Sequence, residues 1–452
     1  MDDSTAAGAG TRKLTKALVS FAVETPAKAV PANAWEKAKI IVLDTFGVCL
    51  AAAPLPIGRI VSGYAVDAGG PKVATIIGAG GLKTAAPMAA LANGTLANAL
   101  DYNESSHVAT HTLPAVLALA EERGLSGQDV LEAFVIGFEA GSRLAQTFDG
   151  ARAHESGPTY RGWWHVGVLG PVAAAIAAGR LLKLDAPKMA AAIGISTCTS
   201  GGFRRNMGTM AKALHSGNAA RDGIQAALLA GRGFSADPDI IEAPLGFLAA
   251  LCNPDERDDA AIAERLGRTY VIEGKPRIKP FPACTRAHKG IDGALAVRAQ
   301  PGFDLNAIEA VEADLNSFSL LRPEAPDEDA AGFSAAFLIA AALIHGKVGL
   351  DQIAPAVLHD PKVRALMAKV GHKPTQGAER VTVRLKGGKV LTAQIDSGRH
   401  LGTPDEIEGK YREGASRVID RAAASELKDL LLSLDRQPNL TRIMELAGKA
   451  AT

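Results

Sequence analysis

The sequence predicts a mainly α-helical protein, in which both ends of the chain form a large all-helical domain and a smaller α+β domain is inserted between them. Three observations support this fold class. The first part of the chain is rich in Ala and shows helical periodicity, β-type patterns gather between residues 268 and 395, and the C-terminal part is helical again. We therefore expect a helical domain over residues 1–266, completed by 400–452, and an α+β domain over 267–399.

Helical segments follow one another through the first part of the chain, joined by short Gly, Pro and Asn turns. Asn33 is a suitable N-cap before Ala34, because its side chain can accept a hydrogen bond from a free backbone N–H of the first turn. No repeat of fixed period is visible, which argues against a solenoid. The predicted helices cover residues 12–24, 34–52, 84–101, 127–147, 168–183, 186–199, 217–231 and 257–266.

The inserted segment combines strand and helix patterns. Residues 268–272 are rich in strand-forming residues, and 307–316 alternate between apolar and polar residues. The strongest signal is a hairpin, in which 380–385 and 390–395 flank a Lys-Gly-Gly-Lys turn. Helices are predicted between and after these strands, over 286–298, 333–346, 360–369 and 404–450.

Composition excludes several classes of function. The chain of 452 residues can form two or three domains with a large core. Its 49 basic and 48 acidic residues leave a net charge of +1, which provides no global field to attract nucleic acid or an anionic membrane. The four cysteines form no CxxC pair, which argues against a zinc ribbon or a disulfide framework and fits a reduced cytoplasm.

We expect neither a membrane span nor a signal peptide. The longest apolar runs are residues 41–57, 166–183 and 333–350, and each is interrupted by Pro, Asp, Arg or His. These runs are typical of buried helices. The acidic N-terminus lacks the apolar stretch of a signal peptide.

A dense polar segment, residues 101–114, separates two apolar helices, and polar groups in such a place need partners. On one continuous helix, Glu104, His107 and His111 would share a face and could bind a metal ion. However, the spacing is not HExxH, and Pro114 argues against a long helix here. The alternatives are an acid–base loop that binds carboxylates and a hydrogen-bonded helix junction.

His165 precedes a helix of small residues. The positive end of a helix dipole disfavours an imidazolium, so His165 would stay neutral and able to accept a proton, unless it serves only as a cap.

Two further segments are rich in basic residues. Residues 204–222 carry five cationic or imidazole side chains among glycines, which suggests an anionic ligand or, alternatively, a solvated basic surface; they are Arg204, Arg205, Lys212, His215 and Arg221. Pro280 and Pro282 fix an extended backbone that would present Lys279 rigidly. We expect the nearby Cys284 to be structural rather than a reactive thiol. Dinucleotide-binding, phosphate-loop and GxSxG patterns are incomplete or absent.

Together these motifs resemble those of the MmgE/PrpD family over almost the whole chain. Residues 97–111 look like the family's Asp-rich loop that ends in Ala-Thr-His, and His165 stands where the family has a histidine before a helix of small residues. Residues 208–217 look like its Gly-x-Met-x-Lys-x-x-His-x-Gly motif. Residues 279–284 and His288 match its Lys-Pro-Tyr-Pro-x-Cys segment and the following histidine.

The resemblance implies a helical domain with an α+β lid, commonly in a homodimer, and an active site between the two domains. Such a site would bring together side chains from four separate segments, namely Asp101, His111, His165, Lys212 and Lys279. The sequence departs from the family pattern at residues 103–105, which read Asn-Glu-Ser, and after His165, where Val-Gly replaces Pro-Thr. Phe337 stands where many members have Tyr, so a phenol that could donate a proton is missing.

From these residues we expect abstraction of a proton next to a substrate carboxylate, without a metal ion and without a cofactor. Lys212 and Lys279 would hold the carboxylates and stabilise an enediolate-like intermediate. His111 would act as base or acid, with Asp101 orienting it or a neighbour, and His165 would be the second proton carrier. Further residues expected to bind the substrate are Ser105, His107, Arg205, His215, Arg277 and His288.

The favoured function is a lyase similar to 2-methylcitrate dehydratase, acting on a small di- or tricarboxylate. An epimerase or isomerase of a dicarboxylate such as iminodisuccinate, which the missing phenol favours, and a decarboxylase of the cis-aconitate type are the alternatives. A non-enzymatic scaffold is disfavoured because the histidines and lysines of the motifs are retained. We expect a cytoplasmic homodimer that binds neither nucleic acid nor membranes.

Overall fold

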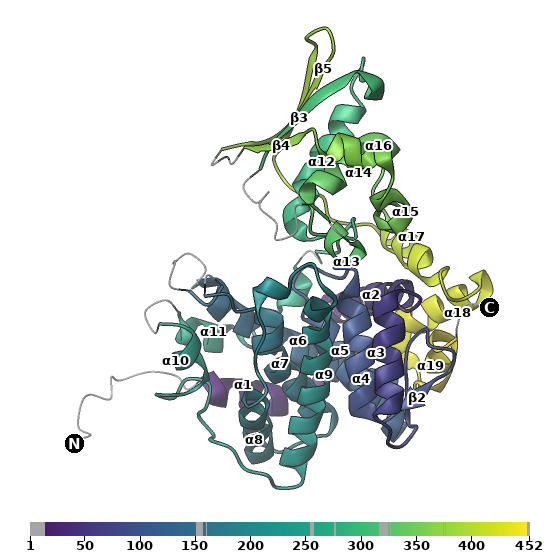
Figure 1. Ribbon diagram of the computed structural model, residues 1–452. Helices are drawn as coiled ribbons and strands as arrows, with labels where there is room; N and C mark the ends of the chain where they lie inside the picture. Colours follow the sequence, from purple (N-terminus) through teal and green to yellow (C-terminus); the bar gives the residue numbers. More distant parts are fainter. Residues whose placement is uncertain are drawn as a thin grey trace.

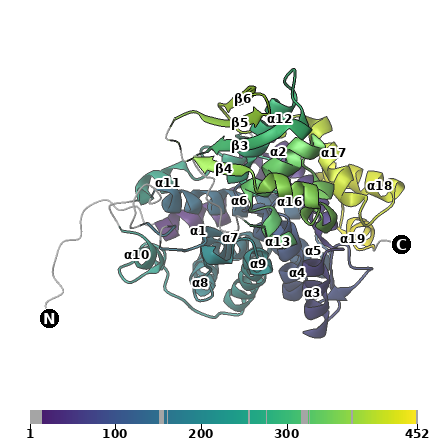
Figure 2. The same ribbon diagram turned by 45° about the horizontal axis from the view of Figure 1, so that its top comes forward.

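The computed structural model describes residues 14–150, 157–159, 161–253, 257–274, 277–315, 324–325, 327–373, 375 and 377–449. The protein is mainly α-helical, with a helical domain formed by both ends of the chain and a smaller lid that contains a four-stranded sheet (Figure 1). This confirms the predicted fold class. Figure 2 brings the lid forward and shows its sheet above the helical domain, with the C-terminal helices at one side.

The helical domain contains most of the helices. They are α1 (Leu14–Glu24), α2 (Ala32–Ala52), α3 (Pro56–Asp67), α4 (Ala86–Ala99), α5 (Ala109–Arg123), α6 (Gly127–Gly150), α7 (His165–Leu181), α8 (Ala186–Thr197), α9 (Met210–Gly231), α10 (Phe247–Leu251), α11 (Asp259–Arg265), α17 (Pro404–Ala415), α18 (Arg421–Leu432) and α19 (Thr441–Ala447). A short antiparallel pair, β1 (Ala74–Thr75) and β2 (Lys83–Thr84), accompanies them.

The lid consists of a four-stranded sheet with helices packed on it. Its elements are α12 (Thr285–Arg298), β3 (Ile308–Asp314), α13 (Glu328–Ala331), α14 (Ala335–His345), α15 (Pro355–Leu358), α16 (Pro361–Met367), β4 (Val370–Lys373), β5 (Glu379–Leu385) and β6 (Val390–Ile395). The strand order is β4-β3-β5-β6, in which β3 and β4 are parallel and the other pairs antiparallel. The predicted β5–β6 hairpin is confirmed, and its turn uses Gly387 and Gly388, both with a φ of 82°.

Two hydrophobic cores correspond to these two parts. One core combines buried side chains from Leu14 to Ile278 with others from Leu401 to Ala447, so both ends of the chain contribute to it. The other runs from Phe281 to Ala393. The chain passes between the cores twice, and the two passages touch, since the Leu401 N–H donates to the Ile278 carbonyl at 3.0 Å. The predicted boundaries near residues 266 and 400 stay predictions.

Small residues allow the central helices to pack closely. α9 lies against α4, α5, α7 and α8. A Cβ added at Gly217 would lie 2.3 Å from the Leu91 carbonyl oxygen of α4, and one added at Gly223 would lie 2.4 Å from the Ala174 Cβ of α7. Both distances are too short for any residue but Gly. This close packing holds the N-terminal end of α9, and with it Lys212, against α4.

Among the described residues, no single helix is both long and apolar enough to cross a membrane. In the described part of the chain, α2 and α3 taken together, with a bend of 95° between them, are the one pair that reaches the required length and composition.

Local details differ from the prediction where tertiary contacts replace the expected local ones. Residues 268–272 form no strand; Val271–Glu273 is a 3₁₀ turn, η5. Side chains of α6 satisfy this backbone, since Val271 N–H donates to Glu139 Oε2 at 2.6 Å and Arg143 Nη2 donates to the Thr269 carbonyl at 2.7 Å. The strand β4 has only four residues and no clear pattern, so it was not predicted.

Two helices also differ from the prediction, α2 at its first residue and α5 at a proline inside it. α2 begins at Ala32 after Pro31, and Asn33 is not its cap. α5 continues through Pro114, although Pro removes a helical donor. The Thr110 carbonyl that loses this donor faces Gly94 of α4, where an added Cβ would lie 3.1 Å away. The backbone of α4 at Gly94 thus lies close to the carbonyl that the proline leaves without its helical donor.

Candidate active site

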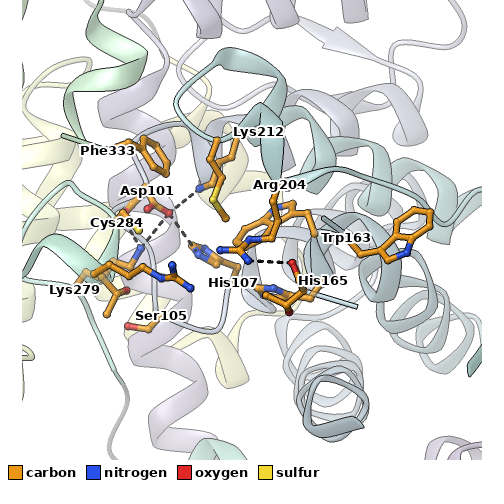
Figure 3. A pocket seen from close by; sticks show the side chains of 15 residues that line it. Asp101, Ser105, His107, Trp163, His165, Arg204, Lys212, Lys279, Cys284 and Phe333 are labelled. Atoms are coloured by element: carbon orange, nitrogen blue, oxygen red, sulfur yellow. Dashed lines mark hydrogen bonds and ion pairs between the residues drawn. The ribbon is translucent and has the colours of Figure 1, made fainter. Parts of the chain in front are cut away.

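A cavity of about 200 Å³ lies where the lid meets the helical domain (Figure 3). The helical domain contributes the loop between α4 and α5, the start of α7 with the residues before it, and the segment from the 3₁₀ turn η3 (Arg204–Asn206) into α9. The lid contributes the chain before α12 and the first residues of that helix. The described residues that line the cavity are Asp101, Ser105, His107, Thr159, Trp163, Trp164, His165, Arg204, Met207, Lys212, Lys279, Cys284, Thr285, Arg286 and Phe333.

Asp101 is the central acidic group of this cavity. It follows α4 in a left-handed conformation, with a φ of 48°. Its Oδ1 lies 2.7 Å from Lys212 Nζ and 3.1 Å from Lys279 Nζ. Burial alone would raise the pKa of the Asp101 carboxyl, but the two ammonium groups, with a smaller contribution from His107, hold this pKa well below its usual range. Asp101 is therefore ionised and orients both lysines.

The two lysines come from different parts of the chain, and both are buried. Lys212 lies in the first turn of α9 and also donates to the Asn98 side chain. Lys279 lies between the two cores and donates to the Asp101 carbonyl at 2.8 Å. Burial lowers the pKa of Lys212, and the carboxylate of Asp101 opposes this shift. With both lysines protonated, two ammonium groups share one carboxylate, and the trio carries one positive charge in excess.

The polar loop before α5 is built around Glu104. Its Oε2 accepts from the backbone N–H and the hydroxyl of Ser106, both at 2.6 Å, and its Oε1 accepts from the Ala109 N–H at 3.2 Å. Glu104 thus caps α5 and does not line the cavity. Since α5 begins at Ala109, Glu104 and His107 precede it, and the helical arrangement on which the metal hypothesis depended is wrong. Among the described residues, no group of three His, Cys, Asp or Glu side chains could hold a metal ion.

His107 lies between Asp101 and the ring of Trp164. Its Nε2 is 3.5 Å from Asp101 Oδ1, and its Nδ1 lies 3.1 Å from the side-chain oxygen of Asn103. Its ring centre is 5.8 Å from that of Trp164 and 6.2 Å from that of His165. Burial, together with the charges of Lys279 and Lys212, holds the pKa of His107 well below its usual range, so His107 is neutral.

His165, expected just before a helix, is the first residue of α7, and it lines the cavity (Figure 3). His111 lies elsewhere. It is 2% exposed on α5 and does not line the main cavity; it adjoins a much smaller one of about 10 Å³, which His165 also lines. Burial and the nearby His165 lower the pKa of His111 to about 3. Within the described part of the chain, neither of its ring nitrogens has a hydrogen-bond partner.

The other predicted substrate-binding residues divide into two groups. Ser105 lines the cavity, and its hydroxyl donates to the Arg277 carbonyl at 2.9 Å. Arg277 itself lies outside the lining. Arg205 is exposed and lies outside the lining. His215 packs against the glycine-rich segment before η3, with its Nδ1 3.2 Å from the Lys212 carbonyl. His288 is buried in the lid, with its Nε2 3.1 Å from the Ala283 carbonyl.

Several lining residues were missed. Arg204 faces the cavity instead of its neighbour Arg205, because the η3 turn points the two side chains in different directions; the Arg-Arg pair was visible, but its orientation was not. Arg286 and Trp163 lie at positions with no distinguishing pattern. Phe333 lines the cavity, with its ring centre 5.7 Å from Lys212 Nζ, while Phe337 is fully buried in the lid core.

Comparisons with known proteins agree with this architecture. Residues 16–259 match the MmgE/PrpD N-terminal domain, and residues 281–436 match the MmgE/PrpD C-terminal domain. A cis-aconitate decarboxylase of Aspergillus terreus is 29% identical, with 92% of each chain covered. The human cis-aconitate decarboxylase is 26% identical over 88% of this chain and 87% of its own. The two domain matches together span most of the sequence, and the chain therefore belongs to the MmgE/PrpD family.

Proposed function

We propose that this protein is a lyase that acts on a small di- or tricarboxylate, using only its own side chains. The observation that carries the proposal is the buried trio of Asp101, Lys212 and Lys279 at a cavity that also contains two histidines. The trio leaves an excess positive charge on buried side chains, where electrostatic interactions with an anion are strong. The two histidines that line the same cavity could transfer a proton, which fits proton transfer at a carbon next to a carboxylate.

Further features of the cavity favour an anion with more than one carboxylate. Arg204 and Arg286 add two cationic side chains to its lining. The N-terminal ends of α7 and α12 also meet the cavity, and neither helix has a side-chain cap at Trp164 or Cys284. Free N–H groups at helix N-termini attract carboxylates. Several positive groups around one small space suit a compact polycarboxylate.

His165 is the better candidate for direct proton transfer, because it lines the cavity, whereas His111 lies behind it. We expect His165→Ala to lower kcat by about 10²–10⁴-fold. His111→Phe should lower it much less if His111 acts only through His165. Steady-state kinetics of the two variants measure this difference. An equal loss of kcat in both would contradict the proposal and would indicate that His111 itself is the base or acid.

Among lyase reactions, decarboxylation of an unsaturated tricarboxylate now has the strongest support, since the relatives named above are cis-aconitate decarboxylases. Such a reaction breaks one C–C bond, releases CO₂ and leaves an electron pair that a proton donor must protonate. Dehydration of a 2-methylcitrate-like substrate would instead require an acid for the departing hydroxide, and epimerisation would return the proton to the opposite face.

The test is incubation in D₂O with cis-aconitate, 2-methylcitrate, citrate, iminodisuccinate, malate and tartrate, each with and without EDTA, followed by proton NMR. Deuterium that enters a carbon next to a carboxylate, unaffected by EDTA, would support the proposed chemistry, and the product would identify the reaction. Binding of these acids in calorimetry without any turnover or exchange would favour the scaffold alternative. Activity that EDTA abolishes would contradict the metal-free proposal.

The expected homodimer is part of the proposal. Light scattering of the purified protein should give about twice the chain mass, and a monomeric mass would contradict it.

A further inference from the structure

A second buried ion pair lies beside the active-site loop, residues 101–108 between α4 and α5. Lys410 Nζ of α17 is 2.6 Å from Asp44 Oδ1 of α2, and the two side chains are 4% and 0% exposed. Burial of two charges is costly, and such a pair contributes little to stability in comparison with apolar side chains of the same size. The chemistry proposed above does not use it, so its presence calls for another explanation.

Lys410 also binds the active-site loop directly. Its Nζ donates a hydrogen bond to the Tyr102 carbonyl and lies 4.0 Å from the centre of the Tyr102 ring. Tyr102 directly follows Asp101, whose left-handed conformation is unfavourable for a residue with a side chain and needs support from its surroundings. The ammonium group of Lys410 therefore holds the residue that directly follows Asp101, whose carboxylate orients Lys212 and Lys279.

The same loop is tied to the passage between the two cores. Lys279 donates to the Asp101 carbonyl, and Ser105 donates to the Arg277 carbonyl. α17 begins at Pro404, shortly after Leu401 pairs with Ile278. Lys410 thus joins three segments that are far apart in sequence: α2, the loop after α4, and the helix that follows the second passage from the lid.

We propose that Lys410, held by Asp44, is a positioning residue, which fixes the Tyr102 carbonyl and through it the orientation of Asp101 against the two lysines. Its kinetic consequence rests on the proposed function. A displacement of catalytic groups by about 1 Å can cost about 100-fold in rate. We therefore expect loss of the Lys410 ammonium to reduce turnover even in a folded protein.

Three variants separate positioning from stability. Lys410→Met removes the ammonium and leaves Asp44 as a buried carboxyl without its partner, so it should lower both the melting temperature and kcat. The double variant Asp44→Asn with Lys410→Met removes both charges of this pair and should regain much of the melting temperature. Lys428→Met is the control, because it removes an ammonium group from another ion pair of α17, in which Lys428 of α18 lies 3.1 Å from Glu408.

The decisive comparison is the double variant with cis-aconitate as the probe. We expect its kcat to stay about 10-fold or more below that of the wild type, with a smaller change in KM, and amide hydrogen exchange in residues 101–108 to be faster. Recovery of kcat together with the melting temperature would show a purely structural pair and overturn the proposal. If the wild type does not turn over cis-aconitate, only the proposed decarboxylation of this acid is contradicted, and unchanged exchange in this loop would still overturn the positioning role.

Discussion

At the residue scale, the charge balance of the cavity depends on Asp101, which neutralises one of the two ammonium groups beside it. We expect Asp101→Asn to destabilise the fold by about 3–5 kcal/mol, because Lys212 and Lys279 would lose their buried partner. Turnover should fall by about 100-fold as the lysines lose their orientation. Urea unfolding and steady-state kinetics measure the two effects.

A suitable control for this variant is Asp185→Asn. Asp185 is an exposed N-cap that accepts from the Lys188 N–H at 3.0 Å, and Asn caps helices about equally well. Its stability should change by less than about 0.5 kcal/mol. Wild-type stability and turnover of Asp101→Asn would contradict the central role given to this carboxylate.

His111 should make the stability of the protein dependent on pH. Its folded-state pKa of about 3 lies below the ordinary value of 6.5, so the unfolded chain binds more protons between these values. Stability should therefore fall as the pH decreases from about 6.5 towards 3, by at most about 1.4 kcal/mol per pH unit from this residue. His111→Phe, which cannot titrate, should show a shallower decrease in urea unfolding at pH 7 and pH 5. Equal slopes in the two proteins would argue against a buried neutral His111.

At the same scale, the sequence identified residue types better than their directions. Asp101, His165, Lys212 and Lys279 were predicted as site residues, and all four line one cavity. Arg204 could not be distinguished from Arg205, because the side-chain directions depend on a single turn of 3₁₀ helix.

At the scale of elements, the close contact between α4 and α9 positions Lys212. We expect Gly217→Ala to destabilise the protein by about 1–3 kcal/mol, because its Cβ would lie 2.3 Å from the Leu91 carbonyl oxygen. The matched control is Gly63→Ala in α3, where nothing lies within 4 Å of the added Cβ. That change should stabilise the helix by up to about 1 kcal/mol. Thermal unfolding compares the two, and a similar sign of change in both would contradict close helix packing as the cause.

The elements that the sequence predicted are those with a strong local pattern. The long Ala-rich helices and the β5–β6 hairpin, with its two glycines, lie where we expected them. Tertiary contacts decided the others. Residues 268–272 have a strand pattern, but their backbone forms hydrogen bonds with the side chains of Glu139 and Arg143 instead of a ladder. The short strand β4 has no strong pattern of its own and pairs with β3.

At the scale of the whole molecule, helices at both ends and strands between them were enough to predict two parts with one inserted into the other. Residues from both ends of the chain contribute to the core of the helical domain, which agrees with that organisation. The position of the cavity could not be obtained from periodicity, because it depends on how the Asp101 loop and Lys279 meet across the two passages of the chain.

Because both cores contribute to the cavity lining, a bound polycarboxylate should hold them together. With cis-aconitate at about 100 times its Kd, openings that release the ligand should become about 100-fold rarer. Amide hydrogen exchange should therefore slow at once in residues 101–108 of the helical domain and in 277–286, which lead into the lid. As a control, the β5–β6 turn at 386–389 lies outside the cavity lining and should exchange at an unchanged rate. Protection confined to one of the two segments would mean that the ligand binds one part alone, in conflict with a site shared between them.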